Sequence, residues 1–416
     1  MSTVGSPSET VSETVLVVGG GQSGFQAVAS LRDKGFPGHV VLIGDEPGVP
    51  YQRPPLSKAY LKGTAGDEAL RLRPEDFFAE KDIQLVAGRV RSLDRAEGQA
   101  VLEDGSKLGY DHLVLATGAR NRTLPVPGAD LDGVLMLRTR DDADRLRAEL
   151  EAARDVVVIG GGFIGLEFAS HAGRPVTVVE AQDRLLARVA SPEVSEFFAR
   201  LHRDAGHTVL LGTGVTALHG EGRVESVELS DGRRLPADLV VVAVGVVPET
   251  GLAEAAGLPV TNGVVVDEHL RTEDPKIFAI GDCANFPCVQ AGAPTRLESV
   301  QNAVDQARCV AASITGGSAP YDSLPWFWTD QTAAKLQIVG ILANADQTVV
   351  TGDLAEGKFS VLSFRDGVLI AVESVNRPAD HIAARRLFTA EQRPSYVDLK
   401  ASAFDLKAHV KSRSAA

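Results

Sequence analysis

The chain has 416 residues, 44% of them hydrophobic, which is enough for about two or three domains with sizeable cores. A net charge of −13 argues against nucleic acid as a main partner, and no apolar run is long enough to span a membrane. The three cysteines, Cys283, Cys288 and Cys309, indicate a reducing compartment rather than a disulfide scaffold. The polar stretch 1–14 has no signal-peptide pattern, so the expected location is the cytoplasm.

The first predicted element is a buried strand, VLVV from Val15, that ends in a glycine-rich turn. Gly19, Gly21 and Gly24 have the spacing G-x-G-x-x-G, and small residues of helical type follow. The first glycine permits a tight turn, the second lets a pyrophosphate approach, and the third lets helix and strand pack closely. The next strand ends at Asp45, whose carboxylate could accept hydrogen bonds from a ribose. This stretch therefore predicts a dinucleotide site at a helix N-terminus.

Two irregular segments follow. PYQRPPLSKAYL, from Pro50, contains three prolines and cannot form a regular helix. HLVLATGAR, from His112, predicts a short strand ending in Thr-Gly, and RNRTLPVPG is a turn-rich crossover.

A second glycine motif begins with the strand VVVI at Val156. Gly160, Gly162 and Gly165 repeat the spacing, and the strand VTVVE ends at Glu180. One such motif is a weak signal, whereas two complete ones, each with its acid, are a strong one. The sequence therefore predicts two nucleotide-binding units.

Two later segments also predict a strand that ends at a glycine. They are DLVVVAVG, from Asp238, and IFAIGD, from Ile277. This pattern indicates one nucleotide-binding domain, residues 1–119 and 246–324, into which a second, residues 120–245, is inserted. RLESVQNAVDQARCVAASI, from Arg296, is an amphipathic helix, and LPWFWTDQ interrupts it as a linker. From about Lys335, alternating runs predict an antiparallel meander and a helix, HIAARRLF, in a third, α+β domain, residues 325–416.

In this order, the two glycine motifs, ATG, FAIGD, RLESVQNAVDQA and PWFWTDQ resemble one family. It comprises the FAD-dependent NADH:ferredoxin reductases of bacterial oxygenase systems, of the putidaredoxin reductase and biphenyl dioxygenase reductase type. The match runs from about Thr14 to about Tyr396. The resemblance implies a glutathione-reductase-like α/β fold with two Rossmann-like domains and a C-terminal α+β interface domain. FAD is expected in the first domain and NADH in the second. The third would help to receive a small 2Fe-2S ferredoxin that supplies a haem monooxygenase or a Rieske dioxygenase.

The resemblance also implies a set of cofactor contacts. The residues that match are Gly19, Gly21, Ser23, Gly24, Asp45, Arg53, Lys58, Val90, Ala116, Thr117, Gly118, Arg138, Gly160, Gly162, Ile164, Gly165, Glu180, Arg188, Gly245, Gly281, Asp282, Val300 and Trp328. Among them, Asp282 is implied on the ribityl chain, the Val300 backbone at the pyrimidine end of the flavin, and Trp328 near the isoalloxazine ring.

Four side chains are expected to act in the reaction. Lys58 would pair with Glu167 at the flavin edge and stabilise the reduced ring, Glu298 would face the nicotinamide, and Trp328 would cover the flavin. The alternatives are a solvated loop lysine, a helix-surface acid and a core tryptophan. No cluster of metal ligands emerges.

Three further features bear on the second domain and on the chemistry. Glu180 favours NADH, because a carboxylate repels a 2′-phosphate, although Arg184 and Arg188 nearby could weaken that preference. Only 11 positions separate Gly165 from the next strand at Val176, against 16 from Gly24 to the strand near Val40, so the second helix should be about one turn shorter. NADH binding is therefore less secure than FAD binding. Cys283 and Cys288 resemble no redox motif, which argues against a disulfide reductase.

The acceptor is expected to bind a locally basic surface, since small ferredoxins are acidic. From Pro325 onward, 11 Lys and Arg residues balance 10 Asp and Glu residues in an otherwise acidic chain. The candidates are Arg385, Arg386, Arg393, Lys407 and Lys411. The alternatives are an NADH oxidase, a rubredoxin or quinone reductase, or a non-enzymatic flavoprotein like apoptosis-inducing factor. The chain is expected to be a monomer or a weak homodimer.

Overall fold

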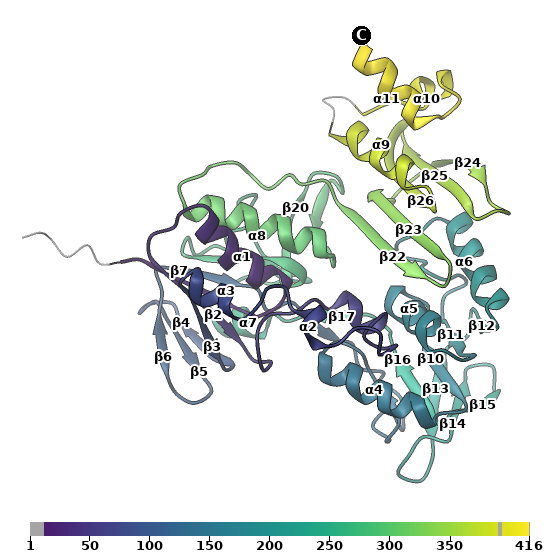
Figure 1. The fold of residues 1–416 in the computed structure, drawn as a ribbon, viewed down its shortest axis with the longest axis horizontal. Helices are drawn as coiled ribbons and strands as arrows, with labels where there is room; N and C mark the ends of the chain where they lie inside the picture. Colours follow the sequence, from purple (N-terminus) through teal and green to yellow (C-terminus); the bar gives the residue numbers. More distant parts are fainter. Residues whose placement is uncertain (1–11, 390–392, 416) are drawn as a thin grey trace, which may run out of the picture.

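The computed structural model describes residues 12–389 and 393–415, and its fold contains two parallel sheets and one antiparallel sheet of five strands each (Figure 1). The first parallel sheet has the order β19-β7-β1-β2-β3. Its strands are β1 (Thr14–Val18), β2 (His39–Gly44), β3 (Ile83–Ala87), β7 (His112–Leu115) and β19 (Ile277–Ala279). Helices α1 (Gln22–Asp33) and α8 (Val300–Ile314) pack against each other beside it.

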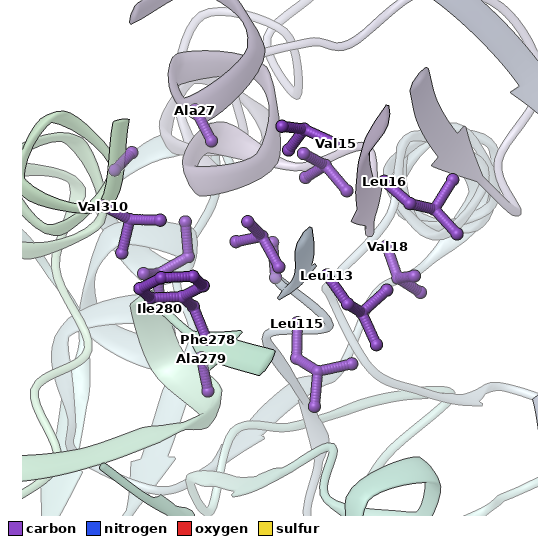
Figure 2. Packing of buried hydrophobic residues seen from close by; sticks show 14 of the residues in the cluster. Val15, Leu16, Val18, Ala27, Leu113, Leu115, Phe278, Ala279, Ile280 and Val310 are labelled. Atoms are coloured by element: carbon purple, nitrogen blue, oxygen red, sulfur yellow. The ribbon is translucent and has the colours of Figure 1, made fainter. Parts of the chain in front are cut away.

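The inner strands β1, β2 and β7 are mostly apolar because both of their faces are covered, whereas the edge strand β3 exposes Gln84 and Leu85. Figure 2 shows buried side chains of this core on both faces of the sheet, with Val15, Leu16, Val18, Ala27, Leu113, Leu115, Phe278, Ala279, Ile280 and Val310 labelled. The remaining elements of this part of the chain are η1 (Pro54–Ser57), α2 (Asp67–Leu70), α3 (Asp76–Glu80), β4 (Val90–Asp94), β5 (Gln99–Leu102), β6 (Lys107–Gly109), α7 (Gly251–Ala255), β18 (Val264–Val265), η2 (Gly281–Cys283), β20 (Ala284–Cys288) and β21 (Ala293–Thr295).

The second parallel sheet repeats this plan with the order β12-β11-β10-β16-β9. Its strands are β9 (Val134–Leu135), β10 (Val156–Ile159), β11 (Thr177–Val179), β12 (Thr208–Leu210) and β16 (Leu239–Val242). The accompanying elements are α4 (Arg140–Ala152), α5 (Phe163–His171), α6 (Pro192–Asp204), β13 (Val215–His219), β14 (Ser226–Leu229) and β15 (Arg234–Pro236).

The chain passes between the two sheets twice, and the two crossovers lie side by side. Strand β8 (Ala119–Asn121) pairs antiparallel with β17 (Val246–Pro248). The expected boundaries of the inserted domain, at 119/120 and 245/246, fall on this two-stranded ladder.

The third sheet is antiparallel with the order β22-β23-β26-β25-β24. Its strands are β22 (Trp326–Gln331), β23 (Ala334–Gly340), β24 (Gln347–Asp353), β25 (Lys358–Arg365) and β26 (Val368–Val375). Helix α9 (Pro378–Phe388) packs on β23 and β26, and α10 (Tyr396–Ala401) and α11 (Leu406–Ala415) follow.

Two predictions about this region were wrong. The segment expected to be a linker is strand β22, whose aromatic and β-branched residues suit a sheet and which pairs with β23 from Trp326 to Gln331. The amphipathic helix was expected from Arg296, but it begins at Val300. The Ser299 hydroxyl accepts a hydrogen bond from the Asn302 N–H and caps it there.

The antiparallel sheet packs directly on the second parallel unit. Phe197 of α6 and Phe359 of β25 have ring centroids 5.2 Å apart in an edge-to-face arrangement. Leu56 of η1 and Phe168 of α5 belong to the same core cluster as Leu336 of β23. The first unit, the second unit and the C-terminal sheet therefore meet at one core. Within the part of the chain that the structure describes, no helix combines the length and the apolar character needed to cross a membrane.

Candidate nucleotide-binding and redox site

The two glycine-rich loops adopt the same backbone conformation. The N–H groups of Gly19 and Gly160 donate to Ile43 O and Val179 O, both at 2.8 Å, and their φ angles are +118° and +113°. A Cβ atom would lie 2.2 Å from a carbonyl oxygen at Gly19 and 2.3 Å at Gly160. Glycine is therefore required at both positions.

The middle glycines leave space at a helix N-terminus. Gly21 and Gly162 are the N-cap residues of α1 and α5, no side chain caps either helix, and a Cβ at either position would meet nothing within 4 Å. The exposed N–H groups and the helix dipole can bind a pyrophosphate there. At Gly24 and Gly165, a Cβ would lie 1.9 and 2.3 Å from the carbonyl oxygen of Gly19 or Gly160. Both loops thus fit a dinucleotide.

The two acids at the ends of β2 and β11 are held differently. The Asp45 side chain is 57% exposed, and its carboxylate lies 3.9 Å from Arg89 Nε. The Glu180 carboxylate accepts hydrogen bonds from the Gly161 N–H at 2.6 Å and from the Gln182 N–H at 2.7 Å. Glu180 is therefore fixed beside its glycine loop, whereas Asp45 faces solvent.

Residues expected near the flavin gather at the carboxyl ends of the first sheet. Arg138 forms an ion pair with Asp282 at 3.2 Å, and Arg53 donates to the Arg138 carbonyl at 2.6 Å. A Cβ on Gly118 would lie 3.5 Å from the Arg138 guanidinium, and one on Gly281 would lie 2.8 Å from the Ser23 hydroxyl. Of the remaining predicted contacts, Ala116 follows β7, the Thr117 hydroxyl donates to Glu249 O at 2.6 Å, Val90 begins β4, and Val300 begins α8.

Lys58 and Glu167 form the predicted ion pair, at 3.1 Å. The Lys58 side chain is only 16% exposed, which excludes a solvated loop lysine. The Glu167 carboxylate is buried and also accepts from the hydroxyls of Ser57 and Thr329, each at 2.7 Å. Burying this pair is unfavourable unless its hydrogen bonds are satisfied, and here they are.

Trp328 and Glu298 lie in different surroundings. Trp328, on β22, is half-buried and lies 5.3 Å from Trp326 between ring centroids, and the Arg385 guanidinium lies 5.1 Å from the Trp326 ring. Glu298 is 38% exposed and pairs with Arg296 at 2.7 Å. The contacts of Trp328 and Glu298 with a flavin or a nicotinamide stay predictions.

In the second unit, the two arginines near Glu180 differ. Arg184 donates to the carbonyls of Ala190 and Ala187 and to the Ser195 hydroxyl. Its guanidinium is therefore already hydrogen-bonded to neighbouring residues of the protein. Arg188 lies beside Gly245, whose Cβ would be 3.5 Å from the guanidinium. Ile164, on α5, is 38% exposed. Only Arg188 therefore remains as a residue that could weaken a preference for NADH.

Several polar residues of this region were missed by the sequence analysis. Thr329 is 162 residues from its partner Glu167, and Gln331 is 129 residues from His202, to which it is hydrogen-bonded. Ser57 precedes the predicted Lys58, yet nothing in the sequence connects it with Glu167. Local spacing carries no signal for such contacts.

Two family models match the sequence. The model described as pyridine nucleotide-disulphide oxidoreductase matches residues 13–307, more than half of the chain, and the model described as reductase C-terminal matches residues 326–410. The chain belongs to the pyridine nucleotide-disulphide oxidoreductase family. This membership confirms the predicted fold, the oxidoreductase class, and the cofactors FAD and NAD(P)H.

Relatives within this family are similar over nearly their full length. A rhodocoxin reductase of Rhodococcus erythropolis is 49% identical over 399 residues, which cover 95% of this chain and 93% of the relative. The ferredoxin reductase for the CYP199A2 system of Rhodopseudomonas palustris is 50% identical, with a TM-score of 0.92 over 95% of this chain and 99% of that one. Putidaredoxin reductase in its covalent complex with putidaredoxin is 40% identical, with a TM-score of 0.93 over 97% and 99%.

Although the family is named for disulphide chemistry, this member has three free thiols. Cys283 is fully buried, and its Sγ contacts the carbonyls of Leu115 and Ile280. Burial raises the pKa of the Cys283 thiol, which keeps it protonated and unreactive. Across residues 12–389 and 393–415, no group of three or more His, Cys, Asp or Glu side chains is arranged to hold a metal ion.

Proposed function

We propose that this oxidoreductase takes electrons from NADH through FAD and passes them to a small 2Fe-2S ferredoxin that supplies an oxygenase, either a haem monooxygenase or a Rieske dioxygenase. The observation that carries the proposal is the ion pair between Lys58 of the first unit and Glu167 on α5, the helix that begins at the second glycine loop. The names of the relatives support a ferredoxin as acceptor.

The proposal divides the work among three domains. Residues 1–119 and 246–324 bind FAD, residues 120–245 bind NADH, and residues 325–416 help to receive the ferredoxin. The bound cofactors supply the electron transfer itself. We place the protein in the cytoplasm as a monomer or a weak homodimer.

The chain's own residues bind and orient these groups. Gly21 and Gly162 leave the helix N-termini open for the two pyrophosphates, and Asp282, which is paired with Arg138, would bind the ribityl chain of FAD. Lys58 would place a positive charge at the flavin edge, where it would stabilise the negative charge of a reduced ring. Trp328, on β22, would cover the ring and exclude water.

An acceptor assay tests the proposal. The purified FAD-loaded protein is supplied with NADH and, separately, with a 2Fe-2S ferredoxin, a rubredoxin, a quinone and oxygen. We expect the ferredoxin to be reduced with the highest kcat/KM. A higher value for a rubredoxin or a quinone would move the protein to one of the other reductase classes.

The surface that meets the ferredoxin can be located in the same assay. Arg385 stacks on Trp326, Arg393 on Phe388 at 5.0 Å, and Lys407 lies 3.8 Å from Asp380, while Arg386 and Lys411 are exposed. If this face binds an acidic ferredoxin, rising salt should weaken electron transfer, and Arg386→Glu should weaken it further. Reduction of ferricyanide should stay normal. Arg203→Glu, at an exposed position of α6, is the matched control, and equal effects of the two reversals would argue against docking at α9.

A further inference from the structure

A chain of buried hydrogen bonds runs from the Lys58–Glu167 pair into the C-terminal sheet. Thr329 Oγ1 donates to Glu167 Oε1 at 2.7 Å, Gln331 Nε2 donates to Thr329 Oγ1 at 3.2 Å, and His202 Nε2 lies 3.0 Å from Gln331 Oε1. Thr329, Gln331 and His202 all have a relative exposure of 0%. The chain thus connects α5, β22 and α6, which lie side by side in Figure 1.

The chemistry of these groups determines which group donates and which accepts in each of these hydrogen bonds. The Gln331 carbonyl oxygen can only accept, so His202 donates through its Nε2–H, and its Nδ1 has no hydrogen-bond partner. Burial lowers the pKa of His202 to about 4, so the ring is neutral. If the oxygen and nitrogen of the Gln331 amide were exchanged, the amide oxygen would face Thr329 Oγ1. The Thr329 hydroxyl would then have to donate to Gln331 and could not donate to Glu167. Every donor in the chain therefore points toward the Glu167 carboxylate.

This arrangement, together with Asp330 Oδ2 of β22 at 3.7 Å from Lys58 Nζ, holds the Lys58 ammonium. Oε1 of Glu167 accepts from Thr329 and from Lys58, and Oε2 accepts from Ser57. Hydrogen bonds to a charged group are stronger than neutral ones, and aligned donors in a buried network reinforce one another. A carboxylate held by donors from two other segments cannot rotate away, and it keeps the ammonium in one position.

We propose that Thr329 and Gln331 are positioning residues of the redox site: β22 of the C-terminal domain holds Glu167, and through it Lys58, at the flavin edge. The C-terminal domain is then part of the site that reduces the flavin, in addition to any role in receiving a partner. This inference rests on the proposed function, since it assigns Lys58 to the flavin edge.

The experiment uses the full FAD-loaded protein and the variants Thr329→Val, Thr329→Ser and Gln331→Met. The first readout is the midpoint potential of the bound FAD, measured by chemical reduction without NADH or ferredoxin. The second is the rate of flavin reduction by NADH in stopped flow. Ser363→Ala, on β25, is the matched control, because it removes a fully buried hydroxyl that has no hydrogen-bond partner.

If Thr329 positions the pair, Thr329→Val should lower the FAD potential and slow flavin reduction about tenfold, the effect expected of one hydrogen bond to a charged group. Gln331→Met should act in the same direction by about threefold, because Thr329 keeps its bond to Glu167. Thr329→Ser should restore both values, and Ser363→Ala should change neither.

An unchanged FAD potential in Thr329→Val would overturn the proposal, and so would an equal change in Ser363→Ala. If Thr329→Val does not fold, the potential of Gln331→Met decides. The potential needs neither NADH nor a ferredoxin. A wild-type protein that fails to accept electrons from NADH would therefore contradict the proposed function while leaving this test valid.

Discussion

Gly24 and Gly165 occupy equivalent places in the two parallel units, each against the carbonyl oxygen of the first glycine of its loop. The helices that follow differ, because α1 has 12 residues and α5 has 9. Helix α1 packs along α8 of its own unit, whereas α5 packs against η1 of the first unit and β22 of the C-terminal sheet. A pyrophosphate needs only the first turn of a helix, so the second unit can use the rest of α5 to join the three parts of the molecule.

Replacing Gly24 and Gly165 by alanine should have the largest effect and should show which cofactor each unit binds. A Cβ would lie 1.9 Å from Gly19 O in Gly24→Ala and 2.3 Å from Gly160 O in Gly165→Ala, both far inside van der Waals contact. We expect Gly24→Ala to lose FAD, and Gly165→Ala to stay yellow but lose reduction by NADH. Flavin content and stopped-flow reduction measure these outcomes.

The control for this pair is Gly251→Ala, where a Cβ would meet nothing within 4 Å. A colourless Gly165→Ala protein together with a yellow Gly24→Ala protein would reverse the assignment of the cofactors to the two units.

Lys58 belongs to the first unit and Glu167 to the second, so their ion pair connects the two units. Removing the pair tests how much this contact contributes to the reaction and to stability. Lys58→Met should slow flavin reduction by NADH about a hundredfold, since it removes a preorganised positive charge, while FAD stays bound. It should also destabilise the protein by roughly 3 kcal/mol, because Glu167 would be buried without its partner charge. Stopped-flow kinetics and urea unfolding measure the two effects. Wild-type kinetics in Lys58→Met would show that the lysine has only a structural role.

The two acids sharpen the comparison at the adenosine end. Glu180→Ala should narrow the preference for NADH over NADPH by on the order of tenfold to a hundredfold, because it removes a hydrogen bond and a repulsion. It also frees the N–H groups of Gly161 and Gln182. Asp45→Ala is the matched change in the first unit and should weaken FAD alone. The measurement is the ratio of kcat/KM for NADH to kcat/KM for NADPH in each variant. Equal use of the two nucleotides by the wild-type protein would contradict the role of Glu180.

The smallest expected effect concerns stability, and it involves the contact between the second unit and the C-terminal sheet. Glu373, fully buried on β26, accepts a hydrogen bond from the Ser191 N–H at the start of α6 at 2.9 Å. Burial raises its pKa from 4.5 to about 7. Between these pH values the folded protein keeps a proton that the unfolded chain has lost. Stability should therefore fall with rising pH through this window, by on the order of 1 kcal/mol per pH unit. Urea unfolding of wild type and Glu373→Gln at several pH values measures it, and equal pH dependence in the two proteins would exclude this contribution.

The glycine loops and their acids could be predicted because their geometry depends on residues a few positions apart. Strand β22 was mistaken for a linker because its pairing with β23 and its packing beside α5 depend on the tertiary structure, which local sequence patterns do not reveal. The donors to Glu167 were missed for the same reason, with Thr329 lying 162 residues away. Arg385 was predicted only as a basic surface residue, and nothing in the sequence indicated that its guanidinium stacks on Trp326.

The ladder formed by β8 and β17 has an evolutionary consequence. Because the chain leaves the first unit at Ala119–Asn121 and returns at Val246–Pro248 on the adjacent strand, the ends of the inserted segment are neighbours. A whole nucleotide-binding module from a relative could be exchanged at these two points without a linker to span a gap. The new module must match two surfaces: η1 of the first unit, which α5 contacts, and the C-terminal sheet, which α5 and α6 contact. If the inserted unit binds NADH as proposed, recombination at this ladder would change the electron donor and leave the flavin site and the acceptor site in place.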